Sequence, residues 1–121
     1  TDLKITGRNR ISVQLYPLFL NREITDFKSI IGKLHKNEIK AIVIETPLHR
    51  YYLEHISIET QKDFSNILKD TGILFKIKTF DMIEKYDDQK IWMDMDHIAH
   101  NPQADQYSDD VANIIITGLK E

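Results

Sequence analysis

The sequence predicts an α/β fold, a small, mostly parallel sheet of about three strands with helices on its faces. Two short apolar runs of the type found in strands buried on both faces occupy residues 40–45 and 73–77. Segments with helical spacing of apolar residues precede these runs, at 22–36 and 58–70, and another ends the chain. This alternation of helix and buried strand is typical of parallel sheets joined by βαβ connections.

Composition narrows the possible partners. The 121 residues fit one compact domain, and 16 basic and 19 acidic residues are mixed along the chain to a net charge of −3. The sequence has no stripe of basic residues of the kind that binds nucleic acid. It also has no apolar run that approaches the roughly 18 residues that a membrane-spanning helix needs. Cysteine is absent, which excludes disulfides, thiolate zinc ligands and thiol catalysis.

The first third of the chain is predicted to form a strand, a helix and a second strand. Apolar and polar residues alternate over 11–15, as in a short half-buried strand, and the proline-broken run 16–20 is expected to be a packed connection. Asn21 is a candidate cap for the helix at 22–36. The buried strand at 40–45 follows after a turn.

Local signals also delimit the middle of the chain. Ser57 can cap the helix at 58–70, and Gly72 is suited to a left-handed stop at its end. The next strand is expected at 73–77, followed by a polar loop with a short helix at 79–88.

Candidate catalytic chemistry is concentrated just before the last helix. Two carboxylates and two imidazoles fall within seven residues, at Asp94, Asp96, His97 and His100. A carboxylate three residues before a histidine can hold the proton of one ring nitrogen and orient the other, as in a nucleophilic triad. The pair Asn101-Pro102 then predicts a helix start, with asparagine as cap and proline in the first position.

A second candidate region follows the first buried strand. Residues 46–52 leave the carboxyl end of that strand, where open α/β sheets usually place their ligand crevices. Thr46, Pro47 and His49 are therefore candidate substrate-binding residues, together with His100. As an alternative, His49 is an ordinary exposed loop histidine.

Three segments, in order, resemble a known superfamily. They are the Asp94-x-x-His97 block, the strand and loop AIVIETPLH at 41–49, and the helix start ADQYSDDVA at 104–112. The pattern resembles the SGNH (GDSL-like) hydrolases and acyltransferases over roughly residues 22–121. The resemblance implies part of a flavodoxin-like three-layer sandwich and an acyl ester substrate, with glycan-linked esters among the candidates and no cofactor.

By this resemblance His97 is the general base that takes the proton of a serine hydroxyl, and Asp94 holds its other ring nitrogen. The chain departs from the pattern, because it contains no Gly-Asp-Ser nucleophile block and no recognisable oxyanion-hole blocks. Gln103 replaces the usual glycine, and His100 lengthens the spacing by one residue. Either histidine could therefore face the site.

Several alternatives remain open. Residues 1–121 are expected to form a single domain that is the C-terminal part of a larger SGNH-like domain, contributing the Asp-His half of a triad. An open sheet edge would then pair with the missing N-terminal half or with another copy of the chain. Alternatively, the chain is a non-catalytic binding or assembly domain that retains the fold. Two local alternatives are a metal site at Asp94, Asp96, His97 and His100, and a loop carboxylate that caps backbone amides.

Overall fold

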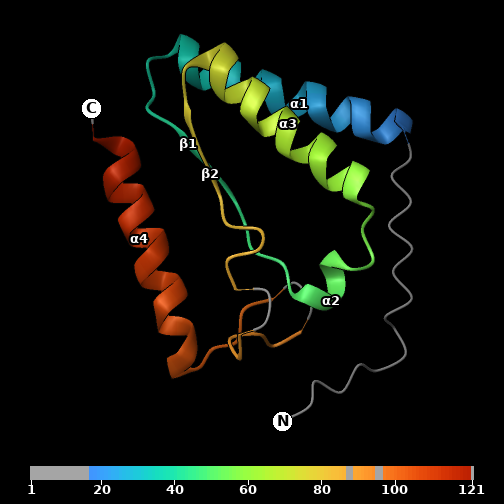
Figure 1. The fold of residues 1–121 in the computed structure, drawn as a ribbon. Helices are drawn as coiled ribbons and strands as arrows, with labels where there is room; N and C mark the ends of the chain where they lie inside the picture. The colour runs from blue at the N-terminus through green and yellow to red at the C-terminus, as the bar shows by residue number, and fades with distance from the viewer. Residues whose placement is uncertain (1–16, 87–88, 95–96, 121) are drawn as a thin grey trace.

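A computed structural model describes residues 17–86, 89–94 and 97–120 (Figure 1). The elements, in chain order, are α1 (Pro17–Lys36), β1 (Ile42–Glu45), α2 (Arg50–Leu53), α3 (Ile58–Phe75), β2 (Lys78–Asp81), the 3-10 turn η1 (Pro102–Ala104) and α4 (Asp105–Leu119). The α/β class predicted from the sequence is confirmed at this level.

The described sheet consists of two parallel strands. The register pairs Ile42 with Lys78 at one end and Glu45 with Asp81 at the other. The parallel pairing agrees with the prediction, and β1 falls within the expected run 40–45. The strand expected at 11–15 lies outside the described residues.

Helices cover both faces of this sheet (Figure 1). On one face α4 packs so closely that a Cβ at Gly118 would lie 2.8 Å from Ile42 Cγ2 and 3.1 Å from Phe80 Cε2. On the other face α3 contacts β2, and α1 lies beside α3. Because neighbouring side chains of a strand point to opposite faces, Val43 and Glu45 point toward the α3 side.

The start of α1 differs from the prediction. The helix begins at Pro17, so the run 16–20 is not a packed connection, and Asn21 lies inside the helix and does not cap it. Proline at the first helical position loses no hydrogen bond, because that amide has no helical partner, and its fixed φ suits a helix. The proline thus starts the helix, whereas the prediction took it as a break.

The segment after Ser57 also differs. Ser57 caps α3 as predicted, since its hydroxyl accepts from the Thr60 amide at 3.1 Å. However, α3 continues through Gly72 to Phe75 and ends at Lys76, which has a left-handed φ of 53°. The strand predicted at 73–77 is therefore wrong, and β2 occupies 78–81 instead of a loop.

Gly72 serves packing rather than helix termination. A Cβ at this position would lie 3.0 Å from Thr79 Cγ2 and 3.1 Å from the Ile77 carbonyl oxygen. The absent side chain lets α3 approach β2 closely. A sequence pattern cannot distinguish a glycine of this kind from one that ends a helix, because both follow a run of helical residues.

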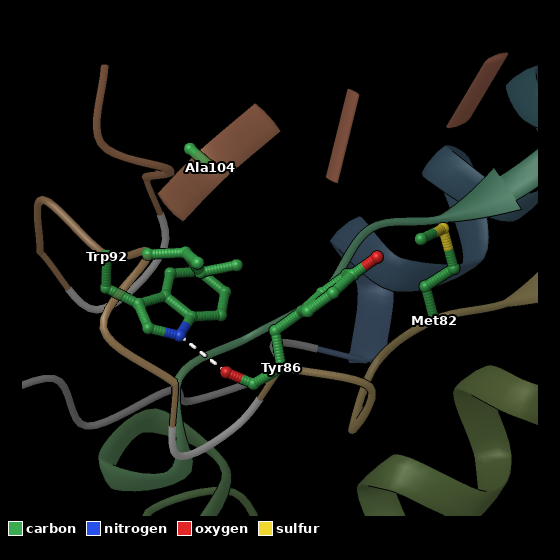
Figure 2. Close-up of a cluster of buried hydrophobic side chains, with 5 residues drawn as sticks. Met82, Tyr86, Trp92 and Ala104 are labelled. Atoms are coloured by element: carbon green, nitrogen blue, oxygen red, sulfur yellow. Dashed lines mark hydrogen bonds between the residues drawn. The ribbon is translucent and has the colours of Figure 1, made fainter. Parts of the chain in front are cut away.

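The main apolar cluster lies between the sheet and α4. Its buried members are Met82, Tyr86, Ile91, Trp92 and Ala104. Figure 2 shows the indole of Trp92 beside Tyr86, with the Trp92 Nε1–H donating to the Tyr86 carbonyl oxygen at 2.6 Å. This bond satisfies the one polar group of the indole, so the ring is buried without an unpaired donor.

Candidate functional site

The candidate site lies at the carboxyl end of the sheet. Both strands point toward the end of the molecule that holds α2 and the beginning of α4 (Figure 1). The loop after β1 is joined to the segment after β2 by a hydrogen bond from the Leu48 amide to the Ile83 carbonyl, at 3.0 Å. Two loops far apart in the sequence are thus held together where α/β folds place their ligand sites.

A short hairpin presents the Asp94–His97 pair. Trp92 and Ile98 form an isolated antiparallel bridge, and the Ala99 amide donates to the Ile91 carbonyl at 2.7 Å. The Met93 amide donates to the His97 carbonyl at 2.9 Å. Because Trp92 is anchored in the core, Asp94 and His97 are held on a fixed base.

Asp94 holds His97 through the ring and through the backbone. The Asp94 Oδ1 and Oδ2 atoms lie 2.8 and 2.9 Å from His97 Nδ1. Oδ1 also accepts from the His97 backbone amide at 2.9 Å. The contact that a base-orienting carboxylate requires is present, and so is the backbone capping that formed the alternative interpretation. One carboxylate makes both interactions.

This geometry favours one tautomer of His97. A carboxylate can only accept, so a proton resides on Nδ1 and the lone pair of the neutral ring is on Nε2. The two side chains are 64% and 50% exposed, which leaves the imidazole within reach of an external group. A pair so open to water is weaker electrostatically than a buried one.

The loop that follows β1, which carries three of the four candidate substrate-binding residues, contacts the hairpin at one point. The rings of His49 and Trp92 meet edge to face with centroids 5.8 Å apart, which links the loop after β1 to the base of the hairpin. His49 also caps α2, since its Nδ1 accepts from the Tyr51 amide at 3.1 Å. Pro47 is buried, whereas Thr46 and His100 are exposed. The roles of all four residues remain predictions.

The helix start after the hairpin follows the prediction. The Asn101 Oδ1 accepts from the Ala104 amide at 3.0 Å, and Pro102 occupies the first position of η1, which leads into α4. The cap thus fixes where the chain turns from the hairpin into α4, which keeps the hairpin beside the carboxyl end of the sheet.

A buried tyrosine connects this region to α4. The Tyr86 hydroxyl donates to Asp110 Oδ2, and Lys85 Nζ lies 3.1 Å from the same oxygen. Burial, together with this carboxylate, raises the pKa of Tyr86 above its usual range, and the tyrosine hydrogen bond lowers the pKa of Asp110. Tyr86 therefore remains a neutral donor at physiological pH, and Asp110 remains ionised.

The sequence-based prediction missed a pair of carboxyl groups on the last rung of the sheet. Glu45 and Asp81 are opposite each other in the parallel register, and Glu45 is only 6% exposed. Burial and, secondarily, Asp81 raise the pKa of Glu45 to about 7. An acidic residue ending an otherwise apolar strand is the signal that could have identified it.

The metal alternative gains no support in the described part of the chain. No group of three or more histidine, aspartate or glutamate side chains there is arranged to hold an ion. Asp96 lies outside the described residues, so the proposed four-residue ligand set stays a prediction.

Comparisons with other proteins do not identify the chain. No protein-family model, curated protein or solved structure matches it. Within the described residues, no helix is both long enough and apolar enough to cross a bilayer.

Proposed function

We propose that the chain supplies the Asp-His half of an SGNH-like esterase or O-acyltransferase site, with His97 as general base and Asp94 as its orienting carboxylate. The observation that carries the proposal is the placement of both Asp94 oxygens within 2.9 Å of His97 Nδ1. The three segments that resemble the superfamily, at 41–49, 94–97 and 104–112, give the proposal its chemical class.

In this proposal the described residues handle the proton. His97 Nε2 takes the proton of an attacking hydroxyl as its oxygen bonds to the acyl carbon. Asp94 stabilises the resulting imidazolium through Nδ1–H. When the tetrahedral intermediate collapses, the imidazolium returns the proton to the departing alkoxide, so charge and protons balance. The hydroxyl nucleophile is not assigned to any residue of this chain.

The proposal extends to the fold. We interpret β1, α3, β2 and α4 as part of a flavodoxin-like three-layer sandwich whose further strands would add at a free edge of the two-stranded sheet. The support is the parallel pairing and the placement of helices on both faces. A site at the carboxyl end of the strands suits this architecture.

Hydrolysis of p-nitrophenyl acetate tests the role of His97. The wild-type protein is expected to accelerate hydrolysis above the buffer rate even with no serine assigned as nucleophile, because an accessible imidazole base can activate water toward this reactive ester. His97→Ala should remove most of that acceleration and Asp94→Asn part of it. His35→Ala, which changes an exposed histidine of α1, is the matched control and should retain the wild-type rate.

Two results would contradict the proposal. Equal rates for wild type and His97→Ala would show that His97 is not a functional base toward esters. Loss of the rate in His100→Ala but not in His97→Ala would transfer the role to the other histidine.

A non-catalytic assembly role is the second candidate, favoured by the apolar surface of α1 and α3. Ile30, Ile73 and Leu74 are each more than half exposed. Large side chains of this kind are usually covered when they form a contiguous patch. Sedimentation velocity tests this role, which predicts a concentration-dependent dimer; a monomer at every concentration would contradict self-assembly.

A further inference from the structure

An open cleft of about 630 Å³ lies in front of the Glu45–Asp81 pair. The first turns of α3 form one wall, with Gln61, Lys62 and Ser65. The segment 82–85 after β2 forms the other wall. Neither Asp94 nor His97 lines this cleft, so it does not belong to the site proposed above.

The carboxyl of Glu45 has an unusual environment. Its side chain is almost fully buried, and in the described part of the chain the carboxyl of Asp81 acts on it through charge repulsion and through a side-chain hydrogen bond. A buried carboxylate is destabilising unless it is protonated or paired with a positive charge. Both carboxyl groups of this pair line the cleft.

The cleft offers acceptors rather than a metal coordination sphere. Gln61 Nε2 donates to the Leu53 and Ile56 carbonyls, both at 3.0 Å, which uses both amide hydrogens and leaves the amide oxygen as an acceptor. Calcium takes six or more oxygen ligands, and no group of three acidic or histidine side chains suited to an ion occurs in the described chain. An ammonium group needs only three acceptors.

We propose that this cleft binds the primary ammonium group of a small organic ligand, with Glu45, Asp81 and the amide oxygen of Gln61 accepting its three hydrogens. Ammonium binding pairs the buried carboxylate with a charge and orients the ligand along α3. The pKa of Glu45, raised to about 7, implies that binding strengthens as the pH rises and this carboxyl ionises.

Other charged side chains that line the cleft affect its affinity for a cation. Glu84 adds a negative charge on the β2 side, while Lys62 from α3 is the cation of the chain itself that could compete for the pair. Lys85 is engaged with Asp110 at 3.1 Å. If Lys62 competes, Lys62→Met should bind external ammonium at least as tightly as wild type.

NMR titration with ethanolamine hydrochloride at about pH 8, where its amine is protonated, tests the proposal on the whole chain. The expected result is saturable shifts of amides lining the cleft, at residues 45, 61–65 and 81–85. Glu45→Gln removes the charge but keeps the shape, and should weaken binding at least about tenfold. Tetramethylammonium, which has the charge but no N–H, should give no saturable shift.

Three results would overturn the proposal. They are the absence of saturable shifts with ethanolamine, unchanged affinity in Glu45→Gln, and saturable binding of calcium chloride at these amides with no response to ethanolamine. Glu45→Gln removes a buried charge, so it is not expected to unfold the protein. A correctly dispersed NMR spectrum of the variant confirms this before titration. None of these outcomes depends on ester hydrolysis by His97.

Discussion

On one face of the two-stranded sheet α4 closes a continuous apolar cluster, whereas on the other face α1 and α3 leave clefts against the strands. The α4 face buries Tyr86 and Trp92, and it anchors the hairpin that presents His97. The α3 face contains the buried Glu45, and Phe64 on α3 is 47% exposed. The packed face thus supports the Asp94–His97 pair, whereas the open face leaves clefts against the strands.

The largest expected effect comes from removing the anchor of the packed face. Trp92→Ala deletes a buried indole and its hydrogen bond, and should reduce the free energy of unfolding by about 3 to 5 kcal/mol. Phe64→Ala on the open face is the matched control and should cost less than about 1 kcal/mol, because the ring is half exposed. Urea denaturation measures both. Equal losses would mean that the faces do not differ in packing.

The pH dependence of stability tests the buried carboxyl of the open face. The pKa of Glu45 is raised to about 7, so the folded state binds this proton more tightly than the unfolded state does. Its stabilising contribution is complete below the ordinary glutamate value and is lost as the pH rises through about 7. Relative to Glu45→Gln, wild type should therefore lose about 2 to 3 kcal/mol between about pH 4 and pH 8.

Denaturation of wild type and Glu45→Gln at several pH values measures this difference. Ionisable groups that do not interact with Glu45 contribute equally in the two proteins and cancel, whereas a change at Asp81 forms part of the measured difference. A difference in unfolding free energy that stays constant across this pH range would contradict the shifted titration of Glu45.

Two glycines compare the packing of α4 against the sheet with the packing of α1 against α3. Gly118→Ala would place a Cβ 2.8 Å from Ile42 Cγ2, and should destabilise by about 1 to 3 kcal/mol despite the better helix propensity of alanine. Gly32→Ala in α1 meets Phe75 Cε1 at 3.3 Å, a ring that can shift, and should be neutral or stabilising by up to about 1 kcal/mol. Thermal unfolding measures both; the opposite order would reverse the comparison.

The smallest effect concerns the hydroxyl of Tyr86. Tyr86→Phe keeps the buried ring and removes the hydrogen bond to Asp110, so it should cost about 1 kcal/mol. The lowered pKa of Asp110, which depends first on this bond, should move back toward its ordinary value. Carboxyl NMR titration follows Asp110 in both proteins, and an unchanged Asp110 titration would show that the bond does not affect it.

Local signals predicted the elements that depend on local chemistry. Ser57, Asn101 and Pro102 act where side chains or proline rings meet neighbouring backbone, so their effect is visible in the sequence. Gly72 and the residues after it were misassigned, because the approach of α3 to β2 is a tertiary contact. A proline such as Pro17 is compatible both with a break and with the first position of a helix, and the local sequence does not distinguish the two.

The candidate site also has a part that the sequence could predict and a part that depends on tertiary contacts. Asp94 and His97 lie three residues apart, so their contact could be anticipated from their spacing. The neighbourhood of Glu45 and Asp81 depends on strand register across 36 residues of chain, and spacing alone does not reveal it. The edge contact of His49 with Trp92 depends likewise on how two distant loops meet.

The tautomer of His97 tests the central claim most directly. Long-range ¹H–¹⁵N NMR at about pH 9, where the imidazole is neutral, distinguishes a protonated Nδ1 from a protonated Nε2. We expect His97 to carry its proton on Nδ1, directed at Asp94, and to lose this preference in Asp94→Asn. A predominantly Nε2-protonated His97 in the wild-type protein would contradict the claim that Asp94 orients it as a base.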